Sequence, residues 1–259
     1  MMFRLLAFLV GAAITSAAPV PFEVTPRAIT RFDAPLPPKA QKLAAVGGNV
    51  APIEAKCAVV VPDGFNPARP WPILVWNAAQ NSSAVDALTE IAPTVNGVGW
   101  VLLAADGGTP AKLETTEWCT AMLAAAIDKL ERSWPTVRRW PMASGGFSGG
   151  SKRAPYLGAV LLENRYRVIG IFLGGCNEDR ATDALRWHKP GPAFQHTPIF
   201  LSGGAQDRTA NPDEQEAVAA SLKKSGFIRV RRESFDGGHE LHAPHLAEAL
   251  RWFVTPAAR

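Results

Sequence analysis

The first feature of the chain that could do chemistry is a serine flanked by glycines. Gly146-Phe-Ser-Gly-Gly150 has the spacing G-x-S-x-G, with a short apolar run before it and a helix-like segment after it. A serine hydroxyl is a weak nucleophile unless a sharp turn presents it beside a base, and small residues on both sides permit that turn. The pattern predicts that Ser148 is a nucleophile. Because Gly and Ser are also common in loops, the hypothesis depends on partners elsewhere.

A candidate acid and a candidate base follow in the order that the chemistry needs. Asp207 stands in a loop after the apolar run 198–202, and His239 follows two glycines after the run 228–235. A nucleophilic serine needs a base to take its proton and an acid to orient that base. We therefore predict Asp207 as the orienting acid and His239 as the general base.

Both partners have alternatives in the sequence. Asp207 could simply begin a turn, where aspartate is favoured. His242 and His245 compete with His239 as the base, although they suit the start of a closing helix better. The histidine spacing is not the H-E-x-x-H pattern of zinc sites, so we predict no metal and no organic cofactor.

Acyl transfer also needs donors for a developing oxyanion. The backbone N–H of Gly149, directly after the serine, is one expected donor. The second is expected in the loop after the apolar run 72–76, where Ala79 is preferred and Ala78 is the next choice. Asn77 and Gln80, in the same loop, are candidates for contacting a substrate.

The elements that must position these residues alternate along the chain. Buried strands separated by helices predict an α/β fold, a mostly parallel sheet with helices on both faces, and ligands bind such sheets at the carboxyl ends of the strands. The expected strands are 55–61, 72–76, 99–105, 140–143, 168–173, 198–202 and 228–235. The expected helices are 84–92, 115–133, one from the serine to about 164, 212–225 and 245–253.

The amino-terminal region divides into two segments ahead of this pattern. Residues 1–17 have a basic start, a short apolar core and a small-x-small site, which predicts a signal peptide and a secreted or periplasmic protein. Residues 18–45 are Pro-rich and predict an extended segment over the domain, which is expected to span 46–259. No other segment is long and apolar enough for a membrane helix.

Composition excludes some function classes. The net charge of +4 is spread thinly apart from an arginine cluster at 229–232, so nucleic-acid binding is not expected. The three cysteines, Cys57, Cys119 and Cys176, allow at most one disulfide, and the sequence leaves their pairing open. It also leaves the oligomeric state open.

Taken together, the serine turn, the loops that carry Asp207 and His239, and the segment Asn77-Ala-Ala-Gln resemble α/β-hydrolase-fold esterases. Residues 57–253 are similar to secreted polyhydroxybutyrate depolymerase-like, feruloyl esterase-like and dienelactone hydrolase-related proteins. The resemblance implies that Ser148, Asp207 and His239 form the catalytic triad, with Ala79 and Gly149 at the oxyanion positions. Those groups usually have His-Gly where this chain has Asn77-Ala78.

The sequence says less about which residues bind a substrate. Residues 174–196 could form a small cap over Ser148, and Trp187 either packs against a substrate or anchors its loop. Lys152 and Arg153 could meet an acidic substrate, but solvent-facing or structural charges are more common. The sequence predicts a secreted serine hydrolase that cleaves small-molecule or polymeric carboxylic esters. The alternatives are a prolyl-oligopeptidase-type peptidase and a non-catalytic binding protein on a hydrolase scaffold.

Overall fold

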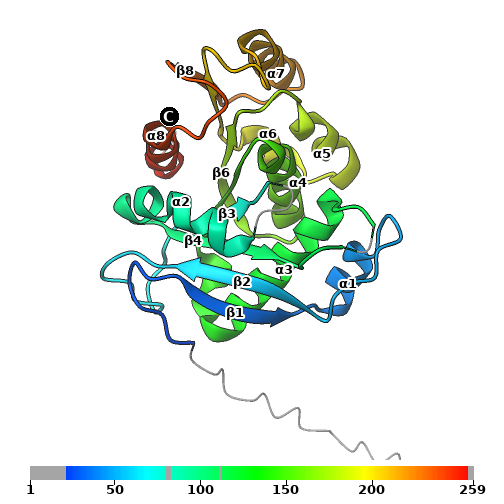
Figure 1. Cartoon of the computed structure of the whole chain (residues 1–259), viewed down its shortest axis with the longest axis vertical. Helices are drawn as coiled ribbons and strands as arrows, with labels where there is room; N and C mark the ends of the chain where they lie inside the picture. The colour runs from blue at the N-terminus through cyan, green and yellow to red at the C-terminus, as the bar shows by residue number, and fades with distance from the viewer. Residues whose placement is uncertain (1–21, 80–82, 111, 256–259) are drawn as a thin grey trace, which may run out of the picture.

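A central sheet with helices on both faces forms the body of the molecule (Figure 1). The computed structural model describes residues 22–79, 83–110 and 112–255, and within them the sheet has eight strands in the order β1-β2-β4-β3-β5-β6-β7-β8. The strands are β1 (Thr30–Pro35), β2 (Glu54–Val60), β3 (Ile73–Asn77), β4 (Val101–Asp106), β5 (Pro141–Phe147), β6 (Arg167–Gly174), β7 (Ile199–Gly204) and β8 (Val230–Phe235). The seven strands expected from the sequence are among them.

The direction of the strands brings the predicted loops to one edge. β2 runs antiparallel to β1 and β4, whereas β4, β3, β5, β6, β7 and β8 are parallel to one another. The register aligns their carboxyl ends, since Phe147 pairs with Gly174 and Gly174 pairs with Ser202. The loops after β5, β7 and β8 therefore open on the same rim.

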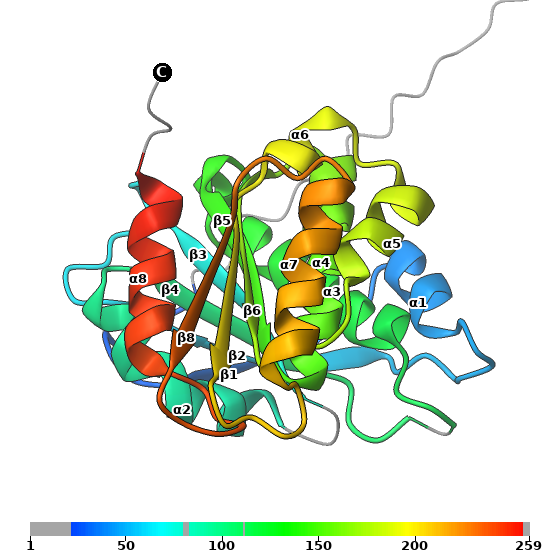
Figure 2. The same cartoon turned by 90° about the horizontal axis from the view of Figure 1, so that it is seen from above.

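The helices form two layers because apolar residues point alternately to the two faces of the strands. In β3, Ile73 packs toward α3, and Leu74 packs toward α2. Figure 2 shows α7 and α8 on opposite sides of the sheet. The helices are α1 (Pro38–Ala44), α2 (Ala84–Gly97), α3 (Thr116–Ser133), the 3₁₀ helix η1 (Pro135–Arg139), α4 (Gly149–Glu163), α5 (Arg180–His188), α6 (Pro192–His196), α7 (Pro212–Lys224) and α8 (Ala243–Val254).

Side chains that accept hydrogen bonds from the first turn mark where several helices begin. The Thr115 side chain caps α3 by accepting from the backbone N–H of Trp118 at 3.0 Å. At α7, Asn211 and Glu214 form a reciprocal capping box. These local signals explain why the expected helices 115–133 and 212–225 begin where they do.

The Pro-rich segment is the main difference from the sequence-based expectation. It contains an edge strand, β1, and the short helix α1, so it is part of the domain instead of lying over it. Ala34 of β1 is fully buried, and the neighbouring side chains are mostly exposed. Because β1 has only one buried position, its sequence shows little of the alternation that predicts a strand. The proline at the start of α1 is compatible with the first turn of a helix, where proline is favoured.

The predicted signal peptide, residues 1–17, lies outside the described residues, so export stays a prediction from the sequence. Among the residues that are described, no helix combines the length and the apolar character needed to cross a bilayer.

Candidate active site

Ser148 lies in a strained turn between β5 and α4. Its φ of 52° and ψ of −119° belong to a region that non-glycine residues rarely adopt. The surrounding backbone holds it there: the Ser148 N–H donates to the carbonyl of Gly174 at 2.8 Å, and the Ser151 hydroxyl donates to the carbonyl of Ser148 at 2.6 Å. The turn presents a half-buried serine at the rim of the sheet.

The two glycines of the G-x-S-x-G pattern are required by close backbone contacts. A Cβ on Gly146 would lie 2.3 Å from the carbonyl carbon of Gly150. A Cβ on Gly150 would lie 2.0 Å from the carbonyl oxygen of Asn77. Neither neighbour is a flexible side chain, so the turn closes only with glycine at both positions.

Ser148, His239 and Asp207 form one hydrogen-bonded chain. The Ser148 hydroxyl lies 2.9 Å from Nε2 of His239, and Nδ1 of His239 lies 2.8 Å from Oδ2 of Asp207. Because an ionised carboxylate only accepts hydrogen bonds, the Nδ1–H donates to Asp207 and leaves Nε2 free to accept from the serine. The structure thus brings together the three residues that the sequence predicts, in a geometry suited to removing the serine proton.

The environment of Asp207 favours the ionised carboxylate. Its side chain is buried, and its other oxygen, Oδ1, accepts from the backbone N–H groups of Thr209 and Ala210 at 2.8 Å each. Burial alone raises the pKa of this carboxyl, but the hydrogen bonds from Ala210, His239 and Thr209 outweigh it and hold the pKa below its usual value. A charged Asp207 can hold the imidazole in one orientation.

The His239 ring is also positioned by packing. It lies against the ring of Phe147, with 4.8 Å between the centroids. On another side it meets Gly175, where a Cβ would lie 3.0 Å from Cε1 of His239. Gly175 has a φ of +54°, so a larger residue there would be strained as well as crowded. The sequence does not single out Gly175, because its role depends on a ring that comes from a distant loop.

The two expected oxyanion donors lie on adjoining segments. Gly149 is the first residue of α4, where backbone N–H groups have no partner within the helix. The loop after β3 packs directly on this end of the helix, since a Cβ on Gly150 would contact both Asn77 and Ala78. This contact places the segment that carries Ala79 beside the start of α4.

Asn77 has a different task from the substrate contact expected for it. Its side chain is 1% exposed, and its amide nitrogen donates to the Ser144 hydroxyl at 3.1 Å and to the Gly145 carbonyl at 3.0 Å. Both partners belong to β5, so Asn77 ties the start of the loop after β3 to the strand that leads to Ser148. The other candidate in this loop, Gln80, lies outside the described residues.

Residues 174–196, considered above as a cap over Ser148, contain α5 and α6, which pack beside α4 through buried residues such as Ala184 and Phe194 (Figure 1). Trp187 projects from α5 with 64% of its surface exposed, and its ring lies 5.6 Å from that of Tyr156. These two rings and Gly149 line one hollow of about 340 Å³. Trp187 therefore stands on the wall of a hollow that reaches the expected oxyanion donor.

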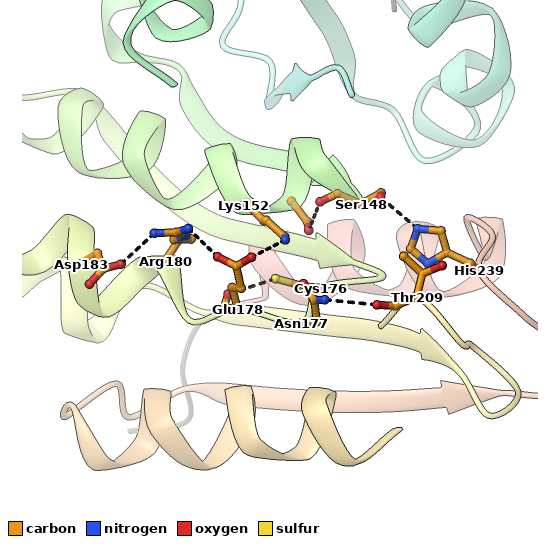
Figure 3. A network of polar contacts seen from close by, with 10 residues as sticks. Ser148, Lys152, Cys176, Asn177, Glu178, Arg180, Asp183, Thr209 and His239 are labelled. Atoms are coloured by element: carbon orange, nitrogen blue, oxygen red, sulfur yellow. Dashed lines mark hydrogen bonds and ion pairs between the residues drawn. The ribbon is translucent and has the colours of Figure 1, made fainter. Parts of the chain in front are cut away.

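A polar network borders the nucleophile helix (Figure 3). Glu178, in the loop after β6, forms ion pairs with Lys152 of α4 and Arg180 of α5. The hydrogen bond and the charge of the Lys152 ammonium, together with the charge of Arg180, hold the pKa of Glu178 below its usual value, although partial burial acts in the opposite direction. Lys152 thus connects α4 to the loop after β6, and it also lines the hollow near Trp187.

His242 and His245, the two alternative candidates for the base, contact residues other than Ser148 and Asp207. His242 stacks on Phe235 with 4.4 Å between ring centroids, and Nδ1 of His245 lies 2.9 Å from the Ser202 hydroxyl. Among the described contacts neither is hydrogen-bonded to Ser148, whose hydroxyl lies within hydrogen-bond distance of His239 alone of the three histidines. In the part of the chain described, no group of three His, Cys, Asp or Glu side chains is placed to hold a metal ion.

The three cysteines are free thiols, which resolves the pairing that the sequence leaves open. Burial raises the pKa of Cys57 and Cys176 above the usual value and raises that of Cys119 to about 12. The thiolate is the reactive form, so we expect the native protein to react with Ellman's reagent at pH 8 at least about 100-fold more slowly than free cysteine. The unfolded protein should release three equivalents of chromophore. A thiol that reacts at the rate of free cysteine in the native state would contradict this placement.

Comparisons with known proteins agree with the fold. No family model matches the chain, and no curated protein sequence matches it either. Among solved structures, a bacterial heroin esterase is similar with a TM-score of 0.62 and 17% identity, over 88% of this chain and 85% of that one. Acyl-protein thioesterase 2 from Zea mays matches with a TM-score of 0.53 and 20% identity, over 76% and 96%. A ferulic acid esterase matches with a TM-score of 0.57 and 11% identity, over 86% and 96%.

The strand order, the strained serine turn and these likenesses define the chain as a protein of the α/β-hydrolase fold. The three solved structures named above are two esterases and a thioesterase, in line with the resemblance seen in the sequence.

Proposed function

We propose that the protein hydrolyses carboxylic esters through an acyl-enzyme formed on Ser148. The observation that carries this proposal is the hydrogen-bonded chain from Ser148 through His239 to Asp207, built on a turn whose strain presents the hydroxyl. Strained residues are kept where the surrounding structure and the function require them.

The geometry supports a two-stage reaction. Oγ of Ser148 attacks the ester carbonyl carbon while Nε2 of His239 takes its proton, and the carbonyl π electrons move to the oxygen. Collapse of this tetrahedral species expels the alcohol, which receives the proton from His239. A water molecule then attacks the acyl-enzyme, again with His239 as base, and releases the acid and the free serine.

Asp207 and two backbone amides complete the proposed machinery. Asp207 remains charged and stabilises the imidazolium that forms at each stage. The N–H groups of Gly149 and Ala79 are proposed to donate to the oxyanion, where preorganised donors contribute strongly to the rate.

The test is covalent labelling of the serine. We expect a fluorophosphonate probe to label the native protein once, with the adduct mapped by peptide mass spectrometry to Ser148. The unlabelled protein should hydrolyse p-nitrophenyl butyrate, and labelling should abolish that activity. Folded protein that neither reacts with the probe nor hydrolyses the ester would instead support a binding protein on this scaffold.

The hollow beside Gly149 suggests how a substrate group is held. Trp187 offers an exposed ring there, and we propose that it packs against a ring of the substrate. Removing such a contact costs about 0.5–1.5 kcal/mol, so Trp187→Ala is expected to raise KM for p-nitrophenyl acetate by about 2- to 13-fold. KM for ethyl acetate, which has no ring, should be unchanged.

The conservative variant Trp187→Phe serves as the control for this prediction. It keeps a ring on the wall of the hollow and should retain most of the affinity for the aryl ester. Equal changes in KM for the aryl and the alkyl ester would show that Trp187 only supports the fold of α5.

A further inference from the structure

A buried arginine connects the nucleophile helix with the oxyanion loop. Arg153, on the second turn of α4, is only 8% exposed, although the sequence favours a solvent-facing charge there. Burying a guanidinium costs free energy unless its donors are satisfied. Nη1 of Arg153 meets two acceptors, the carbonyl oxygen of Ala78 at 3.0 Å and Oε1 of Glu114 at 2.6 Å.

The contact with Ala78 determines the direction of the next amide. The carbonyl of Ala78 and the N–H of Ala79 belong to one trans peptide unit, in which the two groups point in opposite directions. Because Arg153 holds the carbonyl oxygen of Ala78, the Ala79 N–H points away from the Arg153 guanidinium. A flipped peptide at this point would offer a carbonyl oxygen to the oxyanion in place of a donor.

We propose that Arg153 is a positioning residue that orients the Ala79 N–H for the oxyanion and that Glu114 holds Arg153 in place. The proposal rests on the proposed esterase function, because it assigns a task within the same reaction. Arg153 does not touch the reacting atoms.

The rest of the loop explains why such an anchor is needed. Ala78 and Ala79 have no side-chain groups that could bond to the protein, so only their backbone can be held. Asn77 ties the start of the loop to β5, and Arg153 ties its next peptide to α4. Since α4 also begins with Gly149, one helix carries the first donor and fixes the direction of the second.

Glu114 gives the arginine a fixed position. It precedes the capping residue Thr115 of α3, and its side chain is 15% exposed. This second contact, from the segment just before α3, keeps the long Arg153 side chain in one rotamer. The pair also lines two hollows, one of about 230 Å³ under the oxyanion loop and the one near Trp187, so it forms a wall between them.

The test compares Arg153→Met and Arg153→Lys with wild type. Methionine fills similar space without a donor, and loss of a well-placed oxyanion donor costs about 100- to 1000-fold in kcat. Because mispositioning removes part of that effect, we expect Arg153→Met to lower kcat by about 10- to 100-fold with KM within about 3-fold. Arg153→Lys keeps the charge on a side chain that is one bond shorter, and its kcat should fall between those of wild type and the Met variant.

A second readout separates this role from a merely structural one. The Ser148 hydroxyl oxygen adds to the carbonyl carbon of an alkyl trifluoromethyl ketone while His239 takes the proton, and the resulting oxyanion occupies the proposed oxyanion site. Its affinity should fall by the same factor as kcat/KM across the series. If the variants had only a packing defect, the melting temperature would fall, but the loss of inhibitor affinity would not match the loss of kcat/KM.

Arg138→Met is the matched control. The Arg138 guanidinium also contacts a backbone carbonyl, that of Asn164, and a glutamate, Glu131, but it lies before β5, at the opposite end of the strand from Ser148. This variant should keep wild-type kcat and inhibitor affinity.

Two results would overturn the proposal. The first is a folded Arg153→Met variant with wild-type kcat and inhibitor affinity. The second applies if the Met variant does not fold: it is an Arg153→Lys variant with wild-type kcat and inhibitor affinity. In either case a wild-type protein that hydrolyses esters and labels at Ser148 keeps the proposed function intact. If the wild-type protein neither hydrolyses esters nor is labelled at Ser148, both this proposal and the proposed function are contradicted.

Discussion

Replacing Ser148 with alanine is expected to lower kcat for a p-nitrophenyl ester by at least about 10⁴-fold, the scale seen when a triad nucleophile is removed. The reaction loses the atom that forms the acyl-enzyme, and no other hydroxyl is within hydrogen-bond reach of His239 among the contacts of the described residues. Any remaining rate would come from the oxyanion donors acting on a water molecule.

The same change should leave the fold intact. Alanine keeps the Cβ, so the strain at φ 52° is neither relieved nor increased. The hydrogen bond to His239 is lost, which costs about 1 kcal/mol, and the melting temperature should shift by about 2–4 °C.

The measurement pairs ester turnover with a thermal melt, and Ser133→Ala is the control. Ser133 ends α3, and its hydroxyl bonds to the carbonyl of Lys129, remote from the triad. This control should retain full activity. Turnover by Ser148→Ala at the wild-type rate would mean that another residue is the nucleophile.

Replacing Asp207 with asparagine is expected to lower kcat by about 10⁴-fold, because the amide would select the wrong histidine tautomer. Oδ1 of Asp207 accepts two backbone N–H groups, from Thr209 and Ala210. The asparagine oxygen must keep that position, which turns its NH₂ group toward His239. Nδ1 of the histidine then has to accept, its proton moves to Nε2, and Nε2 no longer takes the proton from Ser148.

Stability against pH provides a second readout for the Asp207 variant. The pKa of Asp207 is lowered on folding, so its contribution to stability is present above the unfolded value of about 3.9 and is lost as the pH falls through the lower folded value. Asparagine has no such titration. The melting temperature of the variant should therefore fall less steeply than that of wild type below about pH 4.

Asp236→Asn is the matched control on the same rim. Asp236 is exposed, accepts from the Gln206 side chain at 2.6 Å and lies just before the glycines that lead to His239. Its variant should keep wild-type kcat. An Asp207→Asn variant with comparable activity would show that the carboxylate does not select the tautomer.

Much of the architecture could be predicted because its signals are local. Apolar runs such as Ile73–Trp76 predict buried strands, and the structure confirms the α/β-hydrolase fold that they indicate. Predictions are poorest where local signals are weak, as in β1, which has only one buried residue. The helix α5 is not predicted for a similar reason, since only Ala181 and Ala184 of its residues are buried.

The sequence by itself determined which strand ends would meet, and with them the positions of Ser148, Asp207 and His239 on one rim. Only the tertiary structure decided the contacts of Asn77 and Arg153. A polar side chain turns inward when distant groups satisfy it, and the partners of Arg153 are a carbonyl after β3 and a carboxylate before α3. Such pairings depend on the packing of three separate segments and leave no periodic pattern in the chain.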